Sequence, residues 1–139
     1  MFHKILVGVD GSDHALRAVR LAGELARTCH ADIVIVHAYP PIPPDLGEPN
    51  LQATISERLH EANQVLERAL QEVGFTPRTV ETEALEGAAP DVILRVAEVR
   101  QVDLIVVGSR GLGALASLLL GSQSQEVIQR ATCPVLVVR

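Results

Sequence analysis

Apolar residues along the chain follow two patterns, short runs rich in Val, Ile and Leu and longer stretches with helical spacing. The short runs are nearly continuous, which is typical of strands covered on both faces. The longer stretches repeat apolar residues every three or four positions, as amphipathic helices do. The patterns predict strands at residues 4–10, 32–38, 78–85, 102–107 and 134–138, and helices at residues 12–29, 51–73, 90–99 and 115–131.

Local signals mark where several of these elements begin and end. Ser12 is expected to cap the first helix, and Gly74 is expected to end the second. Pro90 fits the first position of the third helix. Residues 78–85 alternate polar and apolar side chains, which predicts an edge strand with one solvent-facing side. The proline-rich segment 39–50 cannot continue a helix or a central strand, so we expect a semi-rigid surface loop or a lid.

Strands and helices alternate throughout, which defines the expected fold class. This order predicts an α/β fold with a doubly wound parallel five-stranded sheet and helices on both faces. The chain has 139 residues, a length that agrees with one domain spanning residues 1–139.

Composition excludes several classes of function. The net charge is −5 and aromatic residues make up 2%, which argues against a nucleic-acid partner. Lys4 is the only lysine, so a lysine-containing phosphate loop is absent. No membrane span or signal peptide is recognisable, and we expect a cytoplasmic protein without a membrane partner. Cys29 and Cys133 are expected to be small buried apolar residues.

Two strand ends carry residues suited to a polyphosphate. Ligands of doubly wound sheets bind at the carboxyl ends of the strands. The first strand ends in Asp10-Gly11-Ser12, and the fourth runs into the glycine-rich turn 108–113, which contains Arg110. Exposed N–H groups in glycine-rich turns and at helix N-termini bind anions, and the Gly121-Ser122-Gln123-Ser124 segment adds hydroxyl donors. Each of these segments alone could be an ordinary turn, and Asp10 alone could be a turn former. The combination of the three segments favours a nucleotide-binding site.

The spacing Gly108-x2-Gly111-x9-Gly121-Ser122 resembles the ATP-binding motif of the universal stress protein family. The opening ILVGVDGS, the middle DLIVVGSRGLG, the segment LLLGSQSQEVI and the ending CPVLVVR resemble that family too, in the same order. The resemblance therefore covers the whole chain. The proline-heavy loop at residues 40–49 is a departure, and it leaves the role of a lid open.

The resemblance implies a stress-response or signalling protein that binds ATP, ADP or AMP, with strand order 3-2-1-4-5 and a homodimer. It places Asp10 against the ribose and adenine, and the backbone around His37 and Ala38 at the adenine edge. Gly108 would lie near the ribose, and Gly87 would follow the third strand at the same edge. Mg²⁺ or Mn²⁺ would be bound through the phosphates, with no metal site of the protein's own. The phosphates would contact Gly111, Gly121, Ser122 and Gln123, with Ser124 in the same loop and Arg110 as the nearby cation.

Other functions fit the residues less well. Gly111-x-Gly113-x-x-Ala116 matches a dinucleotide fingerprint, but no acidic residue ends the next strand. A phospho-receiver domain needs an aspartate and a lysine at strand ends where this chain has none, and no nucleophile elbow indicates a hydrolase. Two alternatives stay open, a slow ATPase with the same site and an interaction domain without nucleotide. The apolar strand at residues 134–138 is expected to pair with its copy in the homodimer.

Overall fold

The computed structural model describes residues 1–109 and 120–139, in which strands and helices alternate along the chain. All strand pairings are parallel. The strands are β1 (Lys4–Val9), β2 (Asp32–Tyr39), β3 (Val80–Glu86), β4 (Leu104–Gly108) and β5 (Val135–Val138). The helices are α1 (Asp13–Cys29), α2 (Asn50–Val73), α3 (Ala89–Arg100) and α4 (Ser122–Arg130).

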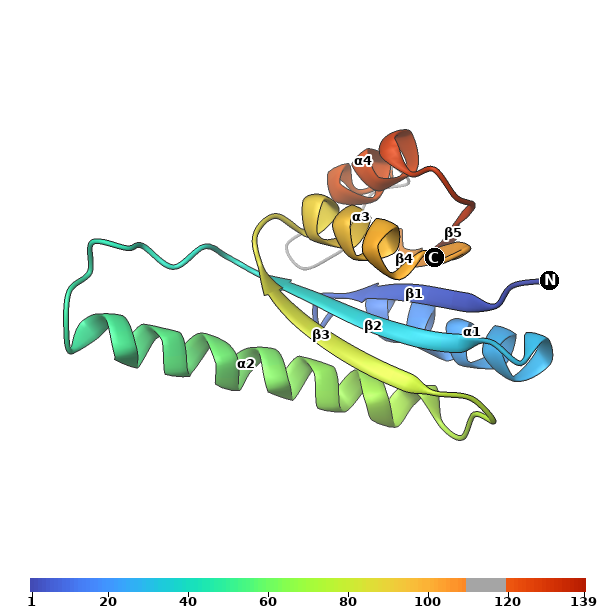
Figure 1. The fold of residues 1–139 in the computed structure, drawn as a ribbon, viewed down its shortest axis with the longest axis horizontal. Coiled ribbons are helices and arrows are strands. Elements are labelled where there is room, and N and C mark those ends of the chain that lie inside the picture. Colours follow the sequence, from blue (N-terminus) through green and yellow to red (C-terminus); the bar gives the residue numbers. More distant parts are fainter. Residues whose placement is uncertain (110–119) are drawn as a thin grey trace.

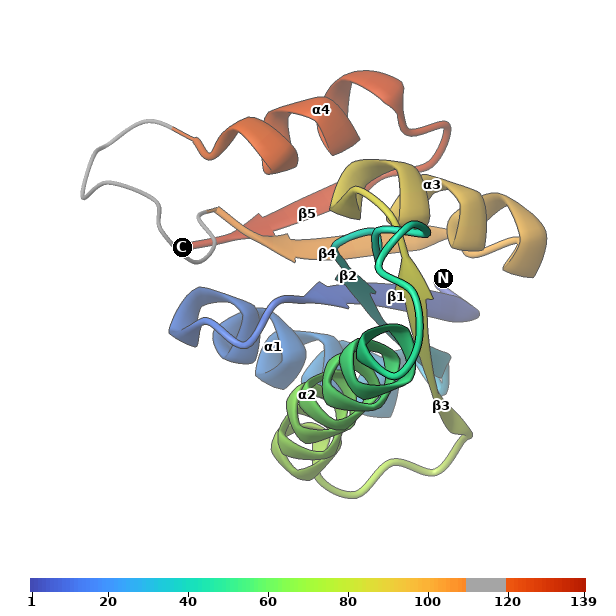
Figure 2. The ribbon, with the colours of Figure 1, turned by 90° about the vertical axis from the view of Figure 1, so that its left-hand side faces the viewer.

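The strands form one sheet in the order β3-β2-β1-β4-β5. Helices α1 and α2 cover one face, and α3 and α4 cover the other, as Figure 2 shows from the end of the sheet. Figure 1 shows α2 running along β2 and β3, with its N-terminal part beyond the ends of both strands. The doubly wound α/β fold and the strand order are therefore confirmed.

Aliphatic side chains on both faces of the sheet form two cores. Ile5, Val7 and Ile35 are fully buried beneath α1 and α2, whereas Leu6 and Ile105 are fully buried beneath α3 and α4. Successive residues of a strand point to opposite faces, so a continuous apolar run supplies both cores at once. Strand β3 lies at the edge of the sheet, as predicted, but its exposed residues do not alternate: Glu81, Thr82 and Glu86 are exposed and the other residues are half-buried.

Two predicted helix boundaries are met, and a third is shifted by one residue. The Ser12 hydroxyl oxygen accepts a hydrogen bond from the backbone N–H of Ala15 at 3.2 Å and caps α1. Gly74 ends α2 with a φ of 73°, a conformation that favours glycine. Pro90 is the second residue of α3, one position later than predicted, and needs no intrahelical donor there.

The predicted helix at 115–131 is wrong in its N-terminal part. Helix α4 begins at Ser122, and residues 120 and 121 are not helical. Gly121 has extended backbone angles, and its N–H donates to the Ser109 carbonyl at 2.7 Å, which ties it to the end of β4. Residues 115–119 lie outside the described part of the chain.

The loop between β2 and α2 lies on the surface, as predicted. Its residues 40–49 are exposed, apart from Ile42, which is half-buried. The backbone N–H of Ile42 donates to the Glu86 carboxylate at 2.9 Å, which links the loop to the end of β3. Across residues 1–109 and 120–139, no helix is long and apolar enough to cross a bilayer.

The two cysteines are half-buried rather than fully buried, so this prediction is only partly met. Cys29 packs at the margin of the core beneath α1, and Cys133 at the margin of the opposite core. Burial, together with the nearby Asp103 carboxylate, raises the pKa of the Cys133 thiol. Both cysteines therefore act as packing residues at the edges of the core.

Candidate functional site

Three of the predicted site residues meet at one edge of the sheet, because parallel strands end on the same side. Asp10 follows β1, Ala38 lies near the end of β2, and Gly108 is the last residue of β4. Since β1 lies between β2 and β4, this edge brings the three residues onto neighbouring positions.

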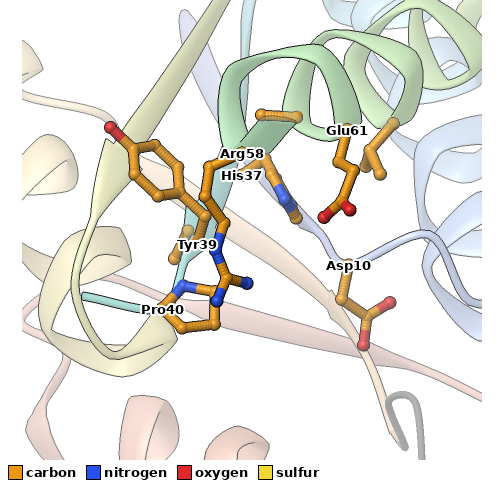
Figure 3. A pocket seen from close by; sticks show the side chains of 9 residues that line it. Asp10, His37, Tyr39, Pro40, Arg58 and Glu61 are labelled. Carbon is orange, nitrogen blue, oxygen red and sulfur yellow. The ribbon is translucent and has the colours of Figure 1, made fainter. Parts of the chain in front are cut away.

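A pocket of about 290 Å³ opens at this edge, between the ends of β1 and β2 and the side of helix α2 (Figure 3). This volume is near the lower limit of small-molecule pockets, roughly 300 Å³, and suits a nucleoside better than a whole nucleoside triphosphate. Its walls combine apolar surface with five ionisable side chains. The lining residues are Asp10, His37, Ala38, Tyr39, Pro40, Arg58, Glu61, Ala62 and Val65.

Asp10 is held by the turn that starts α1. Its carboxylate oxygen Oδ1 accepts a hydrogen bond from the Ser12 N–H at 2.9 Å. Gly11 between them has a φ of 87°, a left-handed conformation that allows this tight turn. The turn fixes a carboxylate at the pocket wall, where it can accept hydrogen bonds from hydroxyl groups of a ligand.

His37 contributes a ring of defined tautomer. Its Nδ1 lies 2.9 Å from the Val9 carbonyl oxygen, and because a carbonyl only accepts, Nδ1 carries the proton. In the neutral ring, Nε2 is then a hydrogen-bond acceptor. The bond also fastens the end of β2 to the end of β1.

The backbone of Ala38 faces the side of the pocket. Earlier in β2, the N–H of Asp32 donates to the residue before β1, and that of Ile33 donates to the residue before β3, each at 2.9 Å. Backbone groups of even-numbered residues in β2 therefore face β1. The β1–β2 register ends at the pair Val9 and His37, so the Ala38 N–H faces the Val9 carbonyl, and the Ala38 C=O lies past the last pair, at the carboxyl end of β1. Ala38 thus presents a backbone acceptor at the pocket.

A second cluster lies at the end of β4. A Cβ atom on Gly108 would lie 3.0 Å from the backbone of His14, so the missing side chain lets α1 approach β4 closely. The buried Ser124 hydroxyl donates to the Gly108 carbonyl at 2.7 Å. The Gly121 N–H donates to Ser109, which holds the start of α4 beside the end of β4.

The N-terminus of α4 has the features of an anion-binding site. Gly121 occupies the N-cap position and, having no side chain, makes no capping hydrogen bond to the first turn. Ser122 and Gln123 are exposed there. Uncapped N–H groups at a helix N-terminus favour negative charge such as phosphate.

Replacing Ser124 with alanine is expected to lower the free energy of unfolding by about 1–2 kcal/mol. The substitution removes a buried hydrogen bond and leaves the Gly108 carbonyl without this donor. Urea denaturation monitored by circular dichroism measures the change. Ser122→Ala is the control, because exposed positions usually change stability by less than about 0.5 kcal/mol. Equal losses in the two variants would contradict this role of Ser124.

The pocket includes residues that sequence reasoning missed. Tyr39, the last residue of β2, and Pro40, which follows it, extend the pocket, and α2 supplies its second wall. The four wall residues recur at positions i, i+3, i+4 and i+7 of one helix, but any one side of a helix has this spacing, so it does not mark a site. These residues are Arg58, Glu61, Ala62 and Val65.

The remaining predicted residues lie elsewhere or outside the description. Gly87 donates its N–H to the Tyr39 carbonyl at 2.9 Å and does not line the pocket. Arg110 and Gly111 lie outside the described residues. Within residues 1–109 and 120–139, no group of three or more His, Cys, Asp or Glu side chains is arranged to hold a metal ion.

Comparisons with known proteins agree with this architecture. The model of the universal stress protein family matches residues 1–139. A universal stress protein from Thermus aquaticus is 46% identical over 139 residues, covering 100% of both chains.

Two solved universal stress proteins have a similar fold. One, in complex with cAMP, has a TM-score of 0.79 and 30% identity, covering 99% of this chain and 97% of its own. The other, from Archaeoglobus fulgidus in complex with dAMP, has a TM-score of 0.75 and 27% identity, covering 99% of this chain and 98% of its own. With the family model matched over its whole length, this chain belongs to the universal stress protein family.

Proposed function

We propose that this protein binds ATP, or ADP or AMP, at the carboxyl ends of β1 and β4 and acts in stress response or signalling. One observation carries the proposal: a nucleoside-sized pocket and an uncapped helix N-terminus lie at the same edge of the sheet. The solved relatives with cAMP and dAMP support the choice of an adenine nucleotide.

In the proposed complex, the adenine edge contacts the Ala38 backbone and the ribose lies against Asp10. The phosphates then extend past Gly108 toward the first turn of α4, where the N–H groups of residues 122–124 face them. Arg110 and Gly111 keep the phosphate-contacting roles that the motif gives them. Mg²⁺ or Mn²⁺ is bound through the phosphates, since hard cations prefer oxygen ligands such as those of phosphate.

Extraction of nucleotide from the purified protein, followed by chromatography, tests the proposal. Recovery of about one adenine nucleotide per chain is the expected result. Protein that is folded, contains no nucleotide and takes up none in a titration would instead favour the interaction domain. Phosphate release during incubation with ATP and Mg²⁺ separates binding from the slow ATPase alternative.

ATP is expected to bind at least about tenfold more tightly than GTP. The Ala38 C=O matches the 6-amino donor of adenine. Guanine has an acceptor at position 6, so this contact would be mispaired, and each tenfold change in affinity corresponds to about 1.4 kcal/mol. Isothermal titration calorimetry measures the two affinities.

Inosine triphosphate is the control for this preference. It has the hydrogen-bonding groups of guanine at positions 1 and 6 but lacks the 2-amino group. We expect it to bind as weakly as GTP. Affinity equal to that of ATP would show that the 2-amino group, and not the Ala38 backbone, causes the discrimination.

A further inference from the structure

Helix α2 forms the wall of the pocket opposite the strand ends, and it is fixed firmly against the rest of the fold. Ala62 is 1% exposed and lies next to Glu61 on this wall. Farther along the helix, Arg20 on α1 pairs with Glu72 at 2.7 Å, and Arg27 donates to the Val73 carbonyl at 3.0 Å. The side chains that α2 places in the pocket therefore start from a rigid backbone.

The two charged side chains of this wall lie at different ends of the pocket. Figure 3 shows the Arg58 guanidinium on the side of Pro40, and the Glu61 carboxylate on the side of Asp10. Asp10 follows β1, the neighbour of β4, whereas Pro40 lies beyond the end of β2 on the side away from β4. The Asp10 side is thus the one nearer to the uncapped N-terminus of α4.

This arrangement determines which part of a nucleotide each end of the pocket would contact. If the base contacts Ala38 and the phosphates reach α4, the sugar occupies the end where Asp10 and Glu61 lie. A ribose has two neighbouring hydroxyl groups, and each is a donor for which a carboxylate is a strong acceptor. Two carboxylates from two different elements match two hydroxyls.

We propose that Glu61 is a specificity-determining residue that, together with Asp10, recognises the 2′,3′-diol of a ribonucleotide. The inference rests on the proposed function and names its substrate class, nucleotides in which both hydroxyls are free. The two ligands named in the solved relatives each lack one of them, since dAMP has no 2′-hydroxyl and the 3′-oxygen of cAMP is esterified. This chain is accordingly expected to bind AMP more tightly than cAMP or dAMP.

The test compares the affinities of ATP, 2′-deoxy-ATP and 3′-deoxy-ATP by calorimetry. These ligands carry the same phosphates and base, so the ratio of two affinities isolates the missing hydroxyl. The wild type is expected to bind ATP at least about tenfold more tightly than each deoxynucleotide, the effect of one hydrogen bond to a charged group. In Glu61→Ala, the preference over one deoxynucleotide disappears and the preference over the other remains, because Asp10 is still present.

Matched variants separate hydrogen bonding from charge. Glu57→Gln removes the same charge from an exposed position one turn earlier on α2, outside the pocket, and should change all three affinities by the same factor. Glu61→Gln keeps an acceptor oxygen and should retain part of the preference. Thermal unfolding of every variant verifies that the fold is intact.

The possible failures are distinguishable. A wild type that binds ATP but does not distinguish it from either deoxynucleotide overturns the inference and leaves the proposed function standing. Folded Glu61→Ala and Glu61→Gln proteins that both keep full discrimination against both deoxynucleotides overturn it as well. A wild type that binds none of the three ligands overturns the proposed function itself.

Discussion

Gly121→Val is expected to lower the affinity for ATP at least about a hundredfold while the protein stays folded. Gly121 is the N-cap of α4, and the phosphates in the proposed complex approach the N–H groups that follow it. A branched side chain at this point would occupy the space of the phosphates. Loss of two hydrogen bonds to charged oxygens, at about 1.5–3 kcal/mol each, exceeds a hundredfold.

Calorimetric titration with ATP measures this loss, and thermal unfolding verifies the fold, because valine is also a poor N-cap residue and costs about 1 kcal/mol. Gln129→Val, at an exposed position near the other end of α4, is the control and should bind ATP normally. Ser122→Ala should lose a single hydrogen bond to phosphate, an effect of about tenfold to a hundredfold. A folded Gly121→Val protein with unchanged ATP affinity would refute the phosphate site.

A lysine on strand β5 is expected to break a homodimer into monomers. Strand β5 lies at an edge of the sheet, and all four of its residues are half-buried. Residues 134–138 carry no charged side chain. Such an edge invites pairing, and a two-fold dimer places the same strand against its copy. Leu136 packs on the side of α1 and Val137 on the side of α3, so Leu136→Lys and Val137→Lys test one face each.

Light scattering at tens of micromolar protein measures the assembly. The wild type should have twice the mass of the 14.9 kDa chain, and at least one lysine variant should have the mass of a single chain. Thr132→Lys, at an exposed position before the strand, is the control and should stay dimeric. A monomeric wild type would exclude pairing through residues 134–138.

The sequence predicted the fold well because its signals are local and repeated. Short apolar runs such as 32–38 are typical of covered strands, and Ser12 and Gly74 mark helix ends through their own chemistry. The start of α4 was mistaken because its apolar neighbours continue the helical spacing, whereas Gly121 is tied to Ser109, which directly follows the distant strand β4. A hydrogen bond between two distant segments does not change the spacing of apolar residues along the sequence.

The candidate site was predictable only in part for a similar reason. Asp10 and Ala38 lie at strand ends, where the sheet topology predicts a ligand. Glu61 lies in the middle of a helix, and only the path of α2, which runs along β2 and β3 and reaches past their carboxyl ends, brings its carboxylate to the pocket. Nothing in the spacing of α2 distinguishes a wall that faces a ligand from one that faces solvent.

The position of Tyr39 has a practical consequence for optical spectroscopy. Tyr39 is the only tyrosine, the chain has no tryptophan, and this single phenol ring lines the pocket. Tyrosine fluorescence of the unlabelled protein therefore originates at one known place, beside the proposed base. Emission from this ring reports on its own surroundings without any contribution from a second tyrosine or a tryptophan, so the protein carries a built-in fluorophore at its candidate site.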